Sequence, residues 1–427
     1  MQRRDLSRAL FASATGAALL SPLAQAQTTN PPYYAITPAE AALAATIPPI
    51  VSIVNYSYPP GYVDRYETNV TPGTTDMSAA FSSAFAVAGY VGNPTTAPKT
   101  SGCSVRWGAT GQYYLGSPVN CTQIRGVVAH DETSGNASSI PPGVIIGHAG
   151  HGFDLSGSTE LVFNNVSATS APGMVPKTLF FMARNTAGSG AGIHRFNNVR
   201  TASNCTFSNV FYSYGSEENI YSNCEIYNSQ GGSTCFNHTT TNTSAYSSTF
   251  MSIASGNQSN SVHRHVGGSY VNLGNSGSVN EVVFQLEGCA NFTFRDGMWD
   301  CPNGLAYVRV VGVGVGRASV FLTFDSIRGE PGGGAHPTYG VDVVSSGTTG
   351  SNSHVFWTFN NVYSDSSGEL LNFASGAEIQ NLTLRACGAQ SGKLLAIYNM
   401  SQSIVENGTS LVTGQAGATV QSNFGSS

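Results

Sequence analysis

The stretch NFTFRDGMWDC spans Asn291 to Cys301, and its Thr-Phe pair recurs along the chain. The shared pattern is an apolar residue, two polar residues, and then usually a small or β-branched apolar residue. The central apolar residues of the recurrences are Phe163, Phe207, Ile226, Phe250, Phe294, Phe324, Phe359 and Leu384. Their separations of 19 to 44 residues match neither the fixed blade period of a propeller nor the tighter spacing of a β-sandwich. They fit the coils of a parallel β-solenoid, the longest steps spanning two coils or one coil with an insertion.

The repeat has a direct physical explanation in such a solenoid. Side chains of a strand alternate between two faces, so the central apolar residues point inward and stack on each other along the axis. The two polar residues that follow make a tight bend between strands. Asn and Gly suit this bend because they tolerate left-handed backbone angles, and Asp296 falls within it. We therefore interpret Asp296 as a structural residue.

The composition favours a turn-rich β protein. Gly accounts for 49 of the 427 residues, whereas Lys and Arg together number only 18 and Asp and Glu 23. A hydrophobic content of 41% excludes an intrinsically disordered chain. The net charge of −5, without a basic stripe, argues against a nucleic acid partner.

The first 26 residues have the layout of an export signal. Arg3 and Arg4 precede an apolar stretch, and the small residues Ala24 and Ala26 end it. The arginine pair is typical of twin-arginine export, and a general-secretion signal with a chance pair is the alternative. No later apolar run has the length of a membrane span. We expect an exported bacterial protein, periplasmic or extracellular, with a Pro-rich irregular arm over residues 27–60.

A helical pattern precedes the repeats. Its apolar residues at helical spacing are Met77, Ala80, Phe81, Ala84, Phe85 and Ala88. Asp76 is a suitable first residue and Gly89 a suitable stop. Because the open end of a solenoid must be covered, we predict a capping helix over residues 76–88, followed by coils that complete a domain of residues 61–427.

The chain has eight cysteines, and none has the spacing of a metal site. In an oxidising compartment, Cys103–Cys121 and Cys289–Cys301 are candidate local disulfides. The alternative is that the cysteines are buried free thiols that pack like small apolar residues. The sequence leaves both interpretations open.

Three segments in order carry a resemblance. YPPGYVDRYETNVTPGTTDMSAAFSSAFAVA, residues 58–88, holds a G-x-T-D turn before the expected helix. VRWGATGQYYLGS, residues 105–117, has an aromatic and a G-x-Y strand, and VIIGHAGHGFDL, residues 144–155, has the look of an I-x-G-x-G coil. In these motifs, over roughly residues 55–160, the chain resembles the pectate-lyase-like superfamily related to glycosyl hydrolase family 28.

This resemblance implies an all-β, right-handed, single-stranded parallel β-helix that acts on polysaccharides by hydrolysis or β-elimination. Two positions depart from the pattern, since Glu67 replaces the usual Gly and Met77 a commoner Asp. The chain also lacks the Asp-Asp and Gly-His-Gly set of polygalacturonases and the Arg-x-Pro-x-x-Arg run of common pectate lyases. The resemblance therefore indicates a superfamily and not one activity.

Hydrolysis requires two carboxylates, and the repeats offer a set. Aligned on Phe294, Phe324 and Phe359, the coils place Asp300, Glu330 and Asp365 at the same offset, six residues later. With coils about 4.8 Å apart, these acids would form a column if the turns were equal in length. In this interpretation Asp300 and Glu330 are the catalytic pair. The substrate-binding residues around them are Trp299 as a sugar-stacking platform, Arg295, Asp325 and Arg328. The alternative is that all lie in solvated turns.

Elimination requires a base and a cation, and SVHRHVGG, residues 261–268, offers both. His263 and His265 share one face of a strand, with Arg264 on the other, so the three are candidate catalytic residues. A surface strand with incidental histidines is the alternative. Glu218 and Glu225 are candidate substrate ligands that could also bind Ca²⁺, although solvated loop acids have the same pattern.

Taken together, these patterns predict a secreted, polysaccharide-active β-helix that cleaves glycosidic bonds as a lyase or a hydrolase. The alternative is a non-catalytic carbohydrate-binding or adhesin-like surface protein. No cofactor is required, and Ca²⁺ is the one candidate. The expected partner is a polysaccharide, and assembly as a homotrimer is left open.

Overall fold

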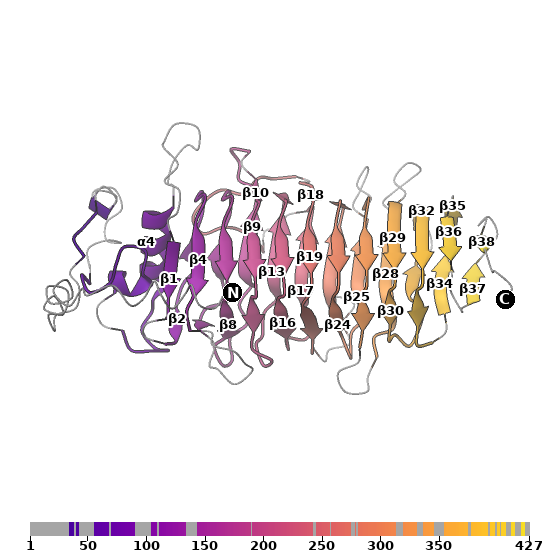
Figure 1. Cartoon of the computed structure of the whole chain (residues 1–427), viewed down its shortest axis with the longest axis horizontal. Helices are drawn as coiled ribbons and strands as arrows, with labels where there is room; N and C mark the ends of the chain where they lie inside the picture. The colour runs from indigo at the N-terminus through magenta and orange to yellow at the C-terminus, as the bar shows by residue number, and fades with distance from the viewer. Residues whose placement is uncertain are drawn as a thin grey trace, which may run out of the picture.

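A computed structural model shows the chain as an elongated solenoid, with helix α4 (Ser78–Ala88) at one end and the last strands at the other (Figure 1). The structure describes residues 34–37, 40–41, 55–67, 70–89, 104–108, 111–133, 143–188, 190–241, 245–256, 258–274, 278, 281–312, 319–330, 336–345, 354–374, 377–391, 393–397, 399–401, 403–406, 411–414 and 420–422. The predicted signal, residues 1–26, lies outside these residues, as does much of the predicted arm.

Three long parallel sheets form the walls of the solenoid, and a short one forms a corner. Sheet A contains β1 (Ser104–Trp107), β4 (Val128–Asp131), β7 (Val162–Asn164), β11 (Arg195–Asn197), β15 (Ile220–Ser222), β19 (Arg264–Val266), β23 (Thr293–Arg295), β26 (Thr323–Asp325), β29 (His354–Asn360), β32 (Glu378–Arg385), β35 (Asn399–Ser401), β36 (Ser403–Glu406) and β38 (Val420–Ser422). Sheet B contains β2 (Tyr113–Leu115), β5 (Val144–Ile146), β8 (Ser167–Ser170), β12 (Arg200–Thr201), β16 (Glu225–Asn228), β20 (Ser269–Asn272), β24 (Met298–Asp300), β27 (Arg328–Gly329), β30 (Tyr363–Ser364) and β33 (Gly388–Ala389).

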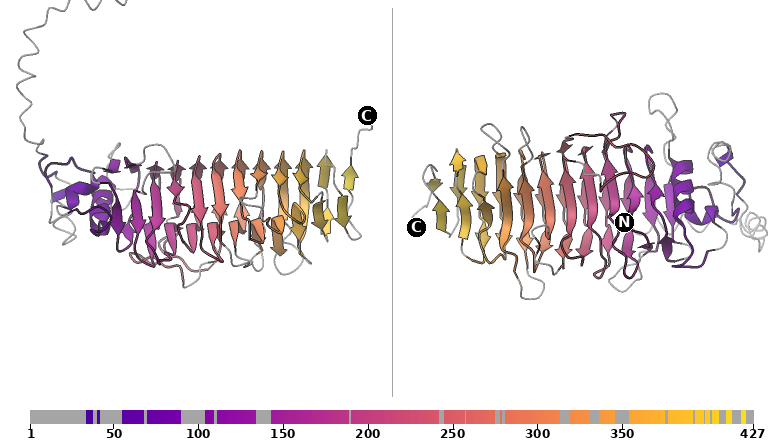
Figure 2. Two further views of the ribbon diagram at one scale, coloured as in Figure 1. Left: turned by 90° about the horizontal axis from the view of Figure 1, so that it is seen from below. Right: turned by 180° about the vertical axis from the view of Figure 1, so that it is seen from behind.

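Sheet C contains β3 (Val119–Asn120), β6 (His151–Asp154), β9 (Thr178–Ala183), β13 (Asn209–Tyr214), β17 (Thr234–Thr239), β21 (Val282–Glu287), β25 (Ala306–Val311), β28 (Tyr339–Ser345), β31 (Leu371–Phe373), β34 (Lys393–Ile397) and β37 (Leu411–Gly414). The corner sheet contains β10 (Ala191–Gly192), β14 (Ser216–Glu217), β18 (Asn260–Ser261) and β22 (Cys289–Ala290). The chain visits the three long sheets in turn, and its successive coils stack side by side along the axis (Figure 2). This confirms the predicted all-β, right-handed parallel β-helix, the hand that parallel crossovers adopt.

Stacked aromatic residues fill the core beneath sheet A. The inward column, read along the axis, is Phe163, Phe196, Tyr221, His265, Phe294, Phe324, Phe359 and Leu384. Phe294 and Phe324 stack with ring centroids 4.8 Å apart, as their spacing in the sequence predicts. A second column beneath sheet C stacks Phe211 on Phe236 at the same separation. Such pairs contribute beyond the area that they bury.

Three of the predicted repeats do not belong to the sheet A column. Phe207 precedes β13, Ile226 lies in β16 of sheet B, and Phe250 is 38% exposed in a loop. Their places in the column are taken by Phe196, Tyr221 and His265. Tyr221 and His265 fill the inward position as well as phenylalanine and so escape a search for Phe, whereas Phe196 has the same Phe-Asn-Asn-Val pattern as Phe163 and belongs to the predicted repeat.

The tight bend between sheets A and B is left-handed, as predicted. Positive φ values recur there at Asn165, Asn198, Asn223, Asp296, Ser326, Asn361 and Ala386. The Asn198 amide donates to the Asn165 side-chain oxygen at 2.8 Å, so neighbouring rungs are linked side chain to side chain. Asp296, with φ 54°, is part of this bend, which confirms its structural assignment.

Helix α4 closes the first coil. Phe81 and Phe85 are fully buried, and the Phe81 ring meets Trp107 at 5.1 Å and Phe153 at 5.9 Å. The Asp76 carboxylate accepts hydrogen bonds from the Ser78 amide and hydroxyl at 3.0 and 2.6 Å, which anchors the start of the helix. The predicted capping helix of residues 76–88 is therefore present two residues shorter.

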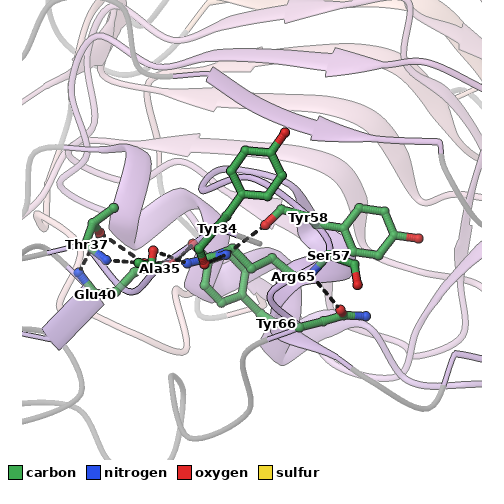
Figure 3. A network of polar contacts seen from close by, with 9 residues as sticks. Tyr34, Ala35, Thr37, Glu40, Ser57, Tyr58, Arg65 and Tyr66 are labelled. Carbon is green, nitrogen blue, oxygen red and sulfur yellow. Dashed lines mark hydrogen bonds and ion pairs between the residues drawn. The ribbon is translucent and has the colours of Figure 1, made fainter. Parts of the chain in front are cut away.

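A buried ion pair fastens the arm to the 3₁₀ turn η1 (Val63–Tyr66) (Figure 3). Arg65 and Glu40 are both fully buried, and the guanidinium donates to both carboxylate oxygens at 2.5 and 2.9 Å. Arg65 also donates to the carbonyl groups of Tyr34 and Tyr58 at 3.1 and 2.7 Å. The Tyr66 hydroxyl donates to Glu40 at 2.9 Å. These bonds satisfy both charges, as a buried pair requires.

The described cysteines are buried free thiols, namely Cys121, Cys205, Cys224, Cys235, Cys289, Cys301 and Cys387. Cys289 contacts the carbonyl oxygen of His238, whereas Cys301 contacts that of Glu281, so these two do not form the candidate disulfide. Cys103 lies outside the described residues. The structure thus favours the alternative in which cysteines pack as small apolar residues.

Candidate functional site

The two candidate histidines, His265 in β19 and His263 just before it, lie inside the solenoid. His263 is 0% exposed and His265 1%, while Arg264 between them is exposed, so the predicted alternation is correct. His265 stacks between Tyr221 at 4.3 Å and Phe294 at 5.0 Å, and His263 stacks on Phe292 at 4.5 Å. A polysaccharide outside the solenoid cannot reach these rings. The interpretation of His263 and His265 as catalytic bases is therefore not supported.

Trp299 is also a core residue. It is 3% exposed, and its indole meets Phe284 at 5.0 Å and Phe294 at 5.6 Å. The predicted sugar-stacking platform is thus unsupported, because alternation in β24 turns Trp299 inward and leaves Met298 outside, 42% exposed.

The predicted column of carboxylates is present along sheet B. Trp299 pairs with Gly329, and the Glu330 amide donates to the Trp299 carbonyl at 2.9 Å, which brings Glu330 beside Asp300. Pairing of Arg328 with Tyr363 places Asp365 next in line. Neighbouring members therefore lie one rung apart, about 4.8 Å along the axis.

Other polar groups surround this column. The Arg328 guanidinium contacts Glu330 at 2.6 Å, and His336 Nδ1 lies 3.6 Å from the Asp365 carboxylate. Burial and the charges of Asp300 and Asp365 raise the pKa of the Tyr307 phenol, so the hydroxyl stays neutral beside them. Asp300 itself is 8% exposed. Glu330 is therefore the most accessible acid of the column, between the more buried Asp300 and Asp365.

A second polar cluster, on the outer face of sheet C, was not predicted. Arg309 pairs with Asp342 and Asp342 with Asn372 on successive strands, while Val308 and Val310 beside Arg309 face the core. Asp342 points outward but is only 7% exposed. The sequence signal is the register of the apolar residues Phe284, Val308, Val341 and Leu371, each of which precedes a polar residue.

The environment of Asp342 shifts its proton affinity upwards. Burial raises the pKa of this carboxyl, and a 2.7 Å hydrogen bond from Asn372 and the charge of Arg309 offset only part of the effect. Burial and the charges of Asp342 and Glu369 raise the pKa of the Tyr339 phenol. The Gly340 amide donates to the Glu369 carbonyl at 3.1 Å, so Glu369, just before β31, lies beside the neighbouring strand β28 that holds Tyr339 and Asp342. These groups can donate and accept protons at a glycosidic bond.

The remaining candidates lie on other faces. Arg295 and Asp325 form an ion pair at 3.2 Å on the outer face of sheet A, as the alignment predicts, with exposed Arg264 on the same face. Glu218 is exposed at the corner before β15. Glu225 is half exposed on sheet B and pairs with Arg200 at 3.4 Å. None of these residues belongs to either acid cluster.

Within the described part of the chain, no group of three or more His, Cys, Asp or Glu residues is placed to hold a metal ion. Among the same residues, no helix is long and apolar enough to cross a membrane.

No known family profile matches the sequence, and no characterised protein matches it either. Solved structures with a similar path of the chain include an alginate lyase from Paenibacillus, 12% identical, with a TM-score of 0.48 over 76% of this chain and 95% of the lyase. The A-module of an Azotobacter vinelandii mannuronan C-5 epimerase is 11% identical, with a TM-score of 0.40 over 80% and 99%. The Streptococcus pneumoniae adhesin PfbA is 12% identical, with a TM-score of 0.40 over 84% and 95%.

Proposed function

We propose that this protein hydrolyses a polysaccharide on the outer face of sheet C, with Asp342 as the proton donor. The observation that carries the proposal is an outward-facing carboxyl that is almost fully buried and whose pKa is raised. Because its pKa is raised, this carboxyl holds a proton to a higher pH than an exposed aspartate, which suits a group that protonates the leaving oxygen.

Glu369 is the second carboxylate in this proposal. The Gly340 amide donates to the Glu369 carbonyl at 3.1 Å, so Glu369 lies just before the strand next to that of Asp342, and we take one sugar residue to contact both acids. Hydrolysis needs two carboxylates of this kind, one protonated and one ionised. Arg309 and Asn372 hold Asp342 in place.

The test is cleavage of a panel of neutral and uronic polysaccharides, with reducing ends and the ultraviolet absorbance of a C4=C5 double bond measured together. We expect reducing ends without absorbance, and a loss of about 100-fold or more in Asp342→Asn and Glu369→Gln. The matched control is Asp325→Asn, which removes a carboxylate on sheet A, away from the proposed site, and should retain activity. Activity that survives in both variants but disappears in Asp300→Asn and Glu330→Gln would move the chemistry to the sheet B column.

Rising absorbance would instead indicate elimination and contradict the hydrolytic assignment. A second candidate function is binding without cleavage, which the exposed charged residues on the outer face of sheet A favour. Absence of products on every substrate, together with retained binding, would support that function.

Export with residues 1–26 as the signal, and any trimeric assembly, remain predictions from the sequence. Amino-terminal sequencing of the exported protein and light scattering of the purified protein address them.

A further inference from the structure

Two exposed arginines on sheet A stand in one line along the solenoid axis. Arg195 of β11 pairs with Ile220 of β15, and Ile220 pairs with Arg264 of β19. All three side chains face outward, because the residues that follow Arg195, Ile220 and Arg264 fill the inward aromatic column. The line therefore reads arginine, half-buried apolar side chain, arginine, and its charges are two rungs, about 9.6 Å, apart.

These two arginines differ from others on the surface of the solenoid. Ion pairs join Arg106 to Glu132, Arg125 to Glu160, Arg200 to Glu225, Arg295 to Asp325 and Arg328 to Glu330. In the part of the chain that the structure describes, neither Arg195 nor Arg264 has an ion-pair partner. Their guanidinium groups are thus available to a carboxylate from outside, which they can bind through two parallel hydrogen bonds.

We propose that Arg195 and Arg264 form a docking site for an acidic polysaccharide, separate from the acids on sheet C. The inference rests on the proposed function only in taking the ligand to be a polysaccharide. An extended chain of pyranose rings advances by nearly one rung per sugar when it lies along the axis. Alternate sugars then present their carboxylates on one side, one to each arginine, while the sugar between them packs its apolar face on Ile220.

An exposed acid, Glu218, lies next to the line of arginines. It is exposed on the corner two residues before Ile220, and its side chain adds negative charge beside the line. A carboxylate ligand is repelled by this charge, so removing it should strengthen binding. Replacement of Ile220 by Glu should have the opposite effect, because an internal carboxylate would lie between the two arginines and occupy them.

The experiment uses the full-length protein in native gels that contain polygalacturonate, alginate or, as a neutral reference, dextran. Wild type should be retarded by at least one of the two acidic polymers and not by dextran. Arg195→Gln and Arg264→Gln should each weaken binding about tenfold, Ile220→Glu should weaken it similarly, and Glu218→Gln should strengthen it.

Arg200→Gln is the matched control, since it removes the same charge from the same coil on sheet B and should bind as wild type. Equal losses in Arg200→Gln would reveal unspecific charge attraction and overturn the proposal, as would unchanged binding in Arg195→Gln and Arg264→Gln or no retardation of wild type. Thermal melts verify that each variant is folded.

The outcome is separable from that of the hydrolysis test. Asp342→Asn should keep full retardation, and Arg264→Gln should still cleave a short neutral or acidic oligosaccharide if wild type does. Loss of cleavage with intact docking in Asp342→Asn is the result that both proposals expect. Unaffected docking in Arg195→Gln and Arg264→Gln, with cleavage intact, overturns the docking site alone.

Discussion

At the scale of single residues, one corner of the solenoid has an unusual backbone. Ile193, Val262, Phe321 and Phe356 adopt positive φ values of 55° to 59°, a region that β-branched and bulky residues rarely occupy. Their positions are equivalent, since each precedes a sheet A strand or lies in its first residues. Phe321 and Phe356 are 50% and 48% exposed, and their rings stack at 5.0 Å. Burial therefore does not explain the choice of these side chains.

We predict that Ile193→Asn stabilises the protein. Asn tolerates the left-handed region, and the 43% exposed Ile193 loses little burial, so the free energy of unfolding should rise by about 1 kcal/mol. Urea denaturation measures the change. The reciprocal control is Asn198→Ile at the other left-handed corner. Its free energy of unfolding should fall by at least about 1 kcal/mol, because the substitution also removes the hydrogen bond to Asn165. Destabilisation by Ile193→Asn would show that the corner is not strained.

The residue scale also shows what the sequence could predict of the site. The offset of Asp300 and Glu330 from their phenylalanines was sufficient to align them, because both coils place the tight bend at the same distance from the stacked ring. Asp342 carries a weaker signal, since only the alternation of apolar and polar residues in its strand marks it as facing outward. Its character comes from burial, which depends on neighbouring strands far away in the sequence.

At the scale of elements, the arm is held by one ion pair. Burial raises the pKa of Glu40, but the hydrogen bonds from Arg65, Thr37 and Tyr66 more than compensate and lower it overall. This pairing links residues 25 positions apart across an irregular segment, so no periodicity in the sequence predicts the contact. The capping helix was predictable because its apolar spacing is local.

We predict that Glu40→Gln lowers the free energy of unfolding by about 3 kcal/mol, because it leaves the buried Arg65 charge without its counter-charge. Thermal denaturation and limited proteolysis of the arm measure the effect. Glu132→Gln removes the half-exposed partner of Arg106 and should cost less than about 1 kcal/mol. Equal effects of the two variants would contradict a special contribution of the buried pair.

At the scale of the whole molecule, the core carries neutral histidines in its middle coils. Burial lowers the pKa of His263 to about 4, and burial and neighbouring His263 lower the pKa of His265 well below its usual value. The rings of His238 and His263 lie 4.8 Å apart, so protonation of one disfavours protonation of the other. The unfolded chain binds these protons near pH 6.5, whereas the folded chain does not.

Stability should therefore be full above about pH 6.5 and decline as the pH falls towards 4, by about 3 kcal/mol for His263 alone. His265→Phe should flatten this decline, because the column already accepts phenylalanine on the next rung at Phe294. Unfolding free energies from pH 4.5 to 7.5 test this. Raised pKa values of Asp131, Asp154 and Asp342 act in the opposite direction, so the difference between variant and wild type isolates the histidine. An unchanged slope would contradict the assignment.

The coil between Tyr221 and His265 is long because of a detour. After β17 the chain leaves the wall, and Tyr246 lies flat on Tyr212 of sheet C with ring centroids 4.1 Å apart. It then returns to pair β18 with β14 in the ordinary parallel manner. The length of a coil is thus independent of its geometry, which is why counting residues between repeats could not locate every rung.

In evolutionary terms, this detour means that the two ends of a corner loop are fixed by the wall, whatever is inserted between them. A change in such a loop would leave the stacked core in place and would alter only the aromatic cluster of Phe181, Tyr212 and Tyr214 that the loop covers. The same property makes the corner after β17 a natural acceptor for grafted peptides, which the solenoid would display with both ends held at a defined distance.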